Sequence, residues 1–116
     1  MQTDLPQNYF KRAILAGKVQ IGLWLSMTSP VSTEAASGAG FDWLIIDMEH
    51  SANEVPDVLN HLRAAEGGTA EAIVRLSWND PVLVKRLLDI GARTLLFPFV
   101  QSAEEARKAV AATRYP

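Results

Sequence analysis

The stretch Gly-Ala-Gly-Phe-Asp-Trp-Leu-Ile-Ile-Asp-Met-Glu-His at residues 38–50 holds a helix end, a strand and a polar turn in succession. Its two glycines are typical of a helix end, and residues 43–46 form an apolar run short enough for a strand. Because this run is continuous rather than alternating, both of its faces should be buried, as in a parallel sheet covered by helices. Asp47, Glu49 and His50 follow directly. The stretch therefore predicts a buried parallel strand that ends in titratable side chains.

The same alternation of apolar runs and helix signals continues along the chain in both directions. Further strands are predicted at residues 21–25, 72–76 and 94–99. Capping residues followed by proline, terminal glycines and apolar spacings of three and four predict helices at residues 9–16, 31–37, 53–66, 81–90 and 103–113. Parallel strands need a crossover between them, which the intervening helices provide. The fold class is therefore α/β, with a short opening helix followed by four βα units.

Composition excludes several classes of protein. With 48% hydrophobic and 21% charged residues, the chain has the balance of a globular protein. The formal net charge is −2 and Lys and Arg do not cluster in the sequence, so the chain lacks the basic patch typical of nucleic-acid-binding proteins. No apolar run approaches the roughly 18 residues needed to cross a membrane. Since the chain has no cysteine, disulfides, thiolate metal sites and cysteine nucleophiles are excluded, and the cytoplasm is the expected location.

Length leaves two architectures open. An open doubly wound sheet fits into 116 residues, whereas a complete eightfold β/α barrel takes about 250. The sequence stops directly after a predicted helix, where another strand would be expected. The chain is thus either a small open α/β domain or the first half of a barrel. No linker or shift in composition divides it, so residues 1–116 are expected to form one segment.

Polar side chains follow each predicted strand, at the end where parallel sheets bind their ligands. His50 is the strongest candidate for a general base, because histidine changes its protonation near neutral pH. The alternative for this residue is a solvated histidine on a surface loop. The polar residues at the four strand ends are Ser26, Thr28, Asp47, Glu49, His50, Ser51, Arg75, Ser77, Asn79 and Gln101.

Arg75 interrupts an apolar strand, and a buried guanidinium needs a partner, typically a carboxylate or a phosphate. It therefore either forms an internal salt bridge with Asp47 or Glu49 or binds an anionic substrate. The two carboxylates could orient His50, bind a metal or water, or only neutralise Arg75. The second histidine, His61, falls in the middle of a predicted helix and is expected on its solvent side.

Several segments together resemble the HpcH/HpaI aldolase family, which includes aldolases of 4-hydroxy-2-oxo acids and of 2-keto-3-deoxy sugar acids. The resemblance covers essentially the whole chain as the N-terminal half of such an enzyme. It implies a (β/α)8 TIM barrel, of which this chain holds about the first four βα units. The segments that carry the resemblance are residues 20–25, 38–50, 74–75, 78–81, 88–92, 97–101 and 112–116.

The resemblance implies a metal-dependent, class II lyase. Such an enzyme reversibly cleaves a 4-hydroxy-2-oxo acid into pyruvate, or a related 2-oxo acid, and an aldehyde. It uses a divalent cation such as Mg²⁺, Mn²⁺ or Co²⁺, whose Glu and Asp ligands are expected beyond this chain, and it commonly assembles as a homo-hexamer. It uses no Schiff-base lysine, and independently of the resemblance every lysine here falls in a predicted helix or turn, not at a strand end.

The resemblance also assigns roles to individual residues. His50 would be the base, Arg75 would bind the 2-oxo acid and stabilise the developing enolate, and Asp89 would raise the basicity of His50. Asp47 would support the same site, and Trp24 would lie beside the substrate. Because Asp89 is near the end of a helix that points toward the opposite face of the barrel, a neighbouring subunit would have to supply its contact with His50.

Two alternatives to this aldolase remain open: an acyl-CoA lyase of the citryl- or malyl-CoA type, and a non-catalytic half-barrel. Four strands fill only about half of each layer of a barrel interior, so inward residues such as Leu23 and Ile45 would lack opposite partners. The outer strands would also present unpaired edges. The 116-residue chain alone is therefore expected to self-associate or to be poorly stable, and to show no aldolase activity.

Overall fold

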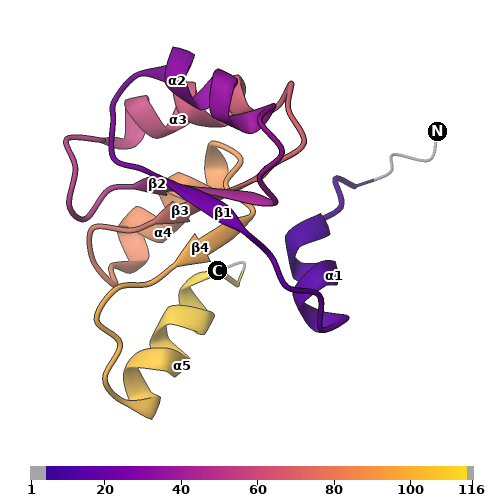
Figure 1. The fold of residues 1–116 in the computed structure, drawn as a ribbon. Helices are drawn as coiled ribbons and strands as arrows, with labels where there is room; N and C mark the ends of the chain where they lie inside the picture. The colour runs from indigo at the N-terminus through magenta and orange to yellow at the C-terminus, as the bar shows by residue number, and fades with distance from the viewer. Residues whose placement is uncertain (1–4, 115–116) are drawn as a thin grey trace.

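A computed structural model describes residues 5–114 as a four-stranded parallel sheet with five helices (Figure 1). Residues 115–116, the end of the last segment resembling the family, lie outside this range. Each strand is followed by a helix and the strands lie in chain order, so the predicted α/β class is confirmed. The elements are α1 (Tyr9–Leu15), β1 (Gly22–Leu25), α2 (Pro30–Ser37), β2 (Trp43–Asp47), α3 (Val55–Ala65), β3 (Glu71–Arg75), α4 (Pro81–Asp89), β4 (Thr94–Leu96) and α5 (Ala103–Ala112).

The helices begin where their capping residues predict. The side chains of Ser29, Asp80 and Ser102 accept hydrogen bonds from backbone amides in the first turns of α2, α4 and α5. Strand β4 ends earlier than predicted, at Leu96. Pro98 has no amide hydrogen to donate to a neighbouring strand, and Phe99 adopts a φ of 55°. The chain therefore turns away from the sheet after β4. No helix within residues 5–114 is long and apolar enough to span a membrane.

The main core lies between the sheet and its helices. Residues in register on parallel strands point to the same side, and the row Leu25, Ile46, Val74 and Leu95 faces the helices. In Figure 1, α2 lies beside α3 and α4 lies beside α5. Each fully buried aliphatic side chain of the core stabilises the fold by about 1.5–3 kcal/mol relative to the same side chain exposed to water. The main cluster consists of Ile46, Met48, Val58, Val74, Leu76, Val84, Leu87 and Ala92.

The prediction that Leu23 faces inward is wrong. Leu23 is in register with Leu44, which packs in the cluster beneath α2 together with Leu25. Trp24, in register with Ile45, therefore points to the opposite face. A continuous apolar run carries no alternation that would assign its faces, so the sequence alone could not place Leu23. Ile45 does lie on the face away from the helices, as predicted, but it is only 6% exposed, so the expectation that it would lack packing partners is wrong.

Gly22 allows the first two strands to approach closely. A Cβ atom at this position would overlap the indole ring of its register neighbour Trp43. We expect Gly22→Ala to lower the free energy of unfolding by about 1–3 kcal/mol, the usual cost of overpacking. Gly38→Ala is the matched control, because its Cβ would meet no atom of the described residues within 4 Å and its φ is −96°. Urea denaturation measures both, and equal midpoints would contradict this packing.

Candidate functional site

The last residues of β2 and β3 meet in a two-pronged ion pair. Asp47 and Arg75 are register neighbours, and Arg75 Nε lies 3.0 Å from Oδ1 of Asp47 while Nη2 lies 2.7 Å from Oδ2. The third guanidinium nitrogen, Nη1, lies 2.9 Å from Oε2 of Glu49. Paired bonds of this kind are strong and fix the plane of the guanidinium. The predicted internal salt bridge is therefore present, and it engages both carboxylates.

The carboxylate of Asp47 organises the strand ends around it. Besides Arg75, it accepts hydrogen bonds from Nε1 of Trp24 at 3.1 Å and from the backbone amides of Glu49 and His50 at 2.8 and 3.3 Å. Burial by itself would raise the pKa of Asp47, but these hydrogen bonds outweigh burial and hold the pKa well below its ordinary value of 3.8. Asp47 is therefore a permanent anion that positions its neighbours and is unsuited to take up a proton.

Arg75 keeps donors available for a ligand. A guanidinium has five N–H groups, and its three observed contacts leave one hydrogen on each Nη atom without a partner among residues 5–114. The hydrogen bond to Asp47 raises the pKa of Arg75 against the opposing effect of burial, so the group stays charged. Its central carbon lies 4.7 Å from the ring centroid of Trp24, a cation–π contact. Trp24 is 43% exposed, so this pair borders open space.

His50 lies beside Glu49, at the end of this row of polar contacts. Its Nε2 lies 3.4 Å from Oε1 of Glu49, and its side chain is 73% exposed. Glu49 thus bridges the guanidinium of Arg75 and the imidazole of His50. The structure therefore brings together four of the five residues to which the resemblance assigns a role, Trp24, Asp47, His50 and Arg75, and adds Glu49 as the link between two of them.

Asp89 is not brought to this site. It is the last residue of α4, is exposed, and leads to the beginning of β4, so it lies at the opposite end of the sheet from Arg75. Within residues 5–114 it forms no ion pair. A direct contact between Asp89 and His50 in one chain is therefore absent, and a contact supplied by another subunit stays a proposal.

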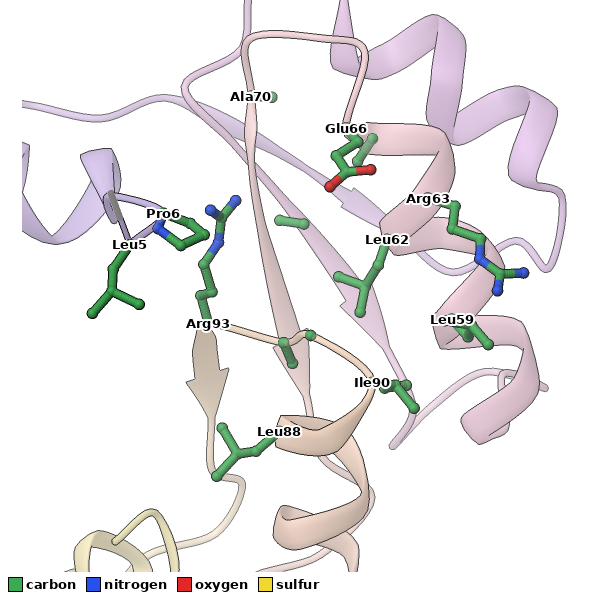
Figure 2. Close-up of a pocket in the computed structure, with 14 residues that line it drawn as sticks. Leu5, Pro6, Leu59, Leu62, Arg63, Glu66, Ala70, Leu88, Ile90 and Arg93 are labelled. Atoms are coloured by element: carbon green, nitrogen blue, oxygen red, sulfur yellow. The ribbon is translucent and has the colours of Figure 1, made fainter. Parts of the chain in front are cut away.

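The larger cavity also lies away from Asp47, Glu49, His50 and Arg75, which we call the charged cluster. It has a volume of about 560 Å³ and is lined by α3, the end of α4, the loop before β4, Ala70 and Ala72 at β3, and Leu5–Pro6 (Figure 2). Its walls are mostly aliphatic, with Arg63, Glu66 and Arg93 at their edges. A smaller cleft of about 190 Å³ lies beside Trp24 and reaches α2. The candidate site is therefore distinguished by its charged groups and not by the size of its cavity.

Two exposed aromatic side chains stand at the same end of the sheet. Trp78 follows β3 and Phe99 follows β4, and their rings stack with centroids 6.1 Å apart and an interplanar angle of 29°. The φ of 55° at Phe99 is unusual for a bulky residue and holds its ring in place for this contact. The pair adds exposed aromatic surface at the end of the sheet where β3 and β4 end.

The described residues do not make up a site for a divalent cation. Within residues 5–114 no group of three or more His, Asp or Glu side chains is arranged to hold a metal ion. The oxygens of Asp47 are engaged by five donors, and those of Glu49 contact Arg75 and His50. Within residues 5–114 these carboxylates are therefore engaged with protein donors and are not arranged around a cation.

His61 was predicted to be exposed, and this prediction is wrong. The side chain is fully buried, with Nδ1 2.7 Å from Oγ1 of Thr33 and Nε2 2.9 Å from Oδ1 of Asn53. The buried face of α3 carries Val58 and Ala65 three positions before and four positions after it. This spacing of three and four residues favours a buried position for His61, whereas the polarity of histidine favours the solvent side of the helix.

The buried histidine makes stability sensitive to mild acid. Burial lowers the pKa of His61 below its ordinary value of 6.5, with the nearby charge of Asp57 opposing. As the pH falls below 6.5, the unfolded chain takes up a proton that the folded chain resists, so the free energy of unfolding should decline by up to about 1.4 kcal/mol per pH unit. His61→Gln should lose this slope. Urea denaturation at pH 7 and pH 5 tests it, and equal slopes in both proteins would contradict the assignment.

Comparison with known proteins agrees with this geometry. The family model described as HpcH/HpaI aldolase/citrate lyase matches residues 20–116. A 4-hydroxy-2-oxo-heptane-1,7-dioate aldolase of Klebsiella pneumoniae is 60% identical over 109 residues, which are 94% of this chain and 41% of that protein. The protein of the same name from Salmonella dublin is 57% identical over 110 residues, 95% of this chain and 42% of that protein. The chain thus spans about two-fifths of the length of these relatives.

Solved structures match the fold. An HpcH/HpaI aldolase/citrate lyase family protein from Burkholderia cenocepacia superposes with a TM-score of 0.90 at 45% identity, covering 95% of this chain and 44% of that one. The match confirms the predicted fold class, α/β of the TIM-barrel type with four βα units in this chain. The extent of the family match and the shared fold lead to one conclusion: the chain belongs to the HpcH/HpaI aldolase family.

Proposed function

We propose that the cluster at the carboxyl ends of β1, β2 and β3 binds a 2-oxo acid and cleaves a carbon–carbon bond next to it. The reaction is the reversible aldol cleavage of a 4-hydroxy-2-oxo acid into pyruvate, or a related 2-oxo acid, and an aldehyde. The observation that carries this proposal is the guanidinium of Arg75, held in one plane by two carboxylates with two N–H groups left for a ligand. The names of the relatives, which are aldolases, support the same class of reaction.

Arg75 stabilises the charge that the reaction creates. Cleavage leaves the electrons of the broken bond on the 2-oxo acid fragment as an enolate, whose negative charge lies on the former carbonyl oxygen. A fixed cation already oriented toward that oxygen stabilises it without reorganisation. Asp47 and Glu49 fix the orientation of Arg75, while Trp24 covers one face of the guanidinium.

His50 takes the proton from the 4-hydroxyl group. An imidazole can remove this proton as the carbon–carbon bond breaks. The carbon of the resulting enolate then takes up a proton, from the imidazolium or from the solvent to which His50 is exposed, and becomes the methyl group of pyruvate. Glu49 Oε1 lies 3.4 Å from the Nε2 atom and can hold the imidazole ring in position. Asp89 from a neighbouring subunit would add to the basicity of His50 in the assembled protein.

The remaining proposals concern the assembled enzyme. A divalent cation, Mg²⁺, Mn²⁺ or Co²⁺, would supply further electrophilic stabilisation when bound, with Glu and Asp ligands from outside residues 5–114. We propose a cytoplasmic homo-oligomer, a hexamer as in related enzymes, in which residues 1–116 form the N-terminal half of a barrel. Its partners are small molecules, and nucleic acids and membranes are not among them.

A chimera tests this function. The matching 109-residue segment of the Klebsiella pneumoniae aldolase is replaced by the corresponding residues of this chain. We expect pyruvate release from a 4-hydroxy-2-oxo acid, lost on treatment with EDTA and restored by Mg²⁺ or Mn²⁺. Cleavage of citryl- or malyl-CoA instead would favour the acyl-CoA lyase. A folded chimera inactive on both kinds of substrate, beside an active parent enzyme, would favour a non-catalytic role.

Substitution of Arg75 by lysine tests the role of the planar guanidinium. A lysine keeps the charge but cannot hold two oxygens in one plane. We expect Arg75→Lys in the chimera to weaken pyruvate and oxalate binding by about tenfold or more, the weight of a charge-assisted hydrogen bond, and also to slow turnover. Arg93→Lys is the control, since Arg93 pairs with Glu71 at the other end of the sheet. Unchanged affinity in a ligand titration would leave Arg75 a structural ion-pair partner.

A further inference from the structure

A chain of buried polar groups lies behind the charged cluster, on the helix side of the sheet. Thr33 of α2, His61 of α3 and Asn53 of the loop before α3 are each at most 1% exposed. Oγ1 of Thr33 lies 2.7 Å from Nδ1 of His61, and Nε2 of His61 lies 2.9 Å from Oδ1 of Asn53. We call these three residues the buried relay.

The hydrogen bonds of the buried relay fix its direction. The Nδ2 atom of Asn53 donates to the backbone carbonyl of Asp47 at 3.0 Å and to Oγ of Ser51 at 2.9 Å, so its Oδ1 atom must accept. Nε2 of His61 then carries the hydrogen. Because burial lowers the pKa of His61, the ring is neutral near pH 7, and Nδ1 accepts from the hydroxyl of Thr33. The imidazole is therefore held in one tautomer. Every bond runs one way, from Thr33 to the carbonyl of Asp47.

The buried relay ends on the turn that carries the charged groups. Ser51 also donates to the carbonyl of Asp47 and accepts from the amide of Asn53 at 3.1 Å. In the same turn, the carboxylate of Asp47 accepts hydrogen bonds from the backbone amides of Glu49 and His50. Two groups of Asp47 thus hold the turn: its backbone carbonyl binds the side chains of Ser51 and Asn53, and its carboxylate binds the amides of Glu49 and His50.

Packing alone does not account for this arrangement. Polar groups are costly to bury unless each is hydrogen-bonded, and an apolar contact between α2 and α3 would carry no such requirement. The neighbouring positions on the same face of α3, Val58 and Ala65, are apolar. The polar side chains occur where the two helices reach the turn of residues 47–53.

We infer that the buried relay of Thr33, His61 and Asn53 positions the turn bearing Glu49 and His50 for catalysis. These are positioning residues, because they contact the turn's backbone and side chains and no reacting atom. The inference concerns how the turn is held, and its catalytic consequence rests on the proposed function. The relay thereby couples the packing of α2 against α3 to the placement of the proposed base.

Amide hydrogen exchange tests this positioning without any activity. Asn53→Asp keeps the shape of Asn53 but removes the donor to the carbonyl of Asp47, and Thr33→Val removes the donor to His61. We expect the exchange of the Glu49 and His50 amides to rise by about tenfold or more in both variants of the chimera. Thr33→Ser, which keeps the hydroxyl, should remain close to the original protein.

Two controls separate positioning from stability. Ser37→Ala also removes a buried hydroxyl from α2, but that hydroxyl bonds to the carbonyl of Glu34 within the same helix. Val84→Ala makes a cavity on α4, a helix that contributes no residue to the relay. Both should leave the exchange of the Glu49 and His50 amides, relative to that of core strand amides, unchanged. ¹⁵N spectra of His61 should show a single Nε2–H tautomer, and a mixture of tautomers in Thr33→Val.

Kinetics in the chimera then test the catalytic consequence. Asn53→Asp and Thr33→Val should lower kcat several-fold while changing KM little, and Thr33→Ser should restore kcat. If the two amides exchange at the original rate in both variants, the inference is overturned whatever the activity. If exchange rises but kcat per folded molecule is unchanged, the positioning of catalysis is overturned. If the chimera without these substitutions is inactive but amide exchange still rises in the two variants, the proposed function is refuted. The inference that the relay positions the turn is then still supported.

Discussion

Replacement of His50 by alanine in the chimera should lower the rate of aldol cleavage by about 10²–10⁴-fold, the usual weight of a general base. The fold should persist, because the side chain is 73% exposed and buries little apolar surface. The measurement is the steady-state rate of pyruvate release, with circular dichroism to verify folding. Lys85→Ala is the control, since this residue lies exposed on α4, away from the cluster. A rate for His50→Ala equal to that of the control would remove His50 from the mechanism.

Replacement of Arg75 by methionine should lower the free energy of unfolding by about 3–5 kcal/mol. The change leaves the carboxylate of Asp47, with a 2% exposed side chain, without its main partner, and an unpaired buried charge is costly. Asp47→Asn in the same protein should recover much of the loss, because it removes the stranded charge. Urea denaturation of the two single variants and the double variant gives the coupling between the residues.

Acid sensitivity provides an independent readout for the same pair. Because the pKa of Asp47 is held below its ordinary value of 3.8, the pair stabilises the fold above that pH, and this stabilisation is lost on further acidification. Arg75→Met should therefore lose less stability than the original protein as the pH falls below 3.8. The same acid dependence in both proteins would show that Arg75 does not stabilise the charged form of Asp47.

The fold could be predicted from the sequence because its signals are local. Continuous apolar runs distinguish parallel strands, and a capping side chain followed by proline marks the start of α2 and α4. The polar residues just past β2 and β3 could be assigned to one end of the sheet for the same reason. Parallel topology brings these ends together whatever the details of packing.

The features that could not be predicted depend on contacts between segments distant in sequence. The face of β1 on which Leu23 lies is set by its register with β2. The burial of His61 is set by polar partners on α2 and on the loop before α3. The sequence offered Asp47 and Glu49 as alternative partners of Arg75, whereas the structure shows that one guanidinium engages both.

The placement of Asp89 shows a different limit. The resemblance assigns it a role beside His50, and its position in the sequence alone places it at the far end of α4. These two statements are compatible only if the contact is made between subunits. Such a contact is a property of the assembly, and it depends on surfaces whose pairing one chain does not determine.

The most direct test of the central claim is the exchange of the methyl protons of pyruvate in D₂O, followed by proton NMR. This reaction needs only the enolate and no aldehyde partner, so it isolates the role assigned to the cluster around Arg75. The chimera should catalyse the exchange, Arg75→Lys should slow it by about tenfold or more, and Arg93→Lys should leave it unchanged. Exchange in Arg75→Lys at the rate of the unsubstituted chimera would contradict the account.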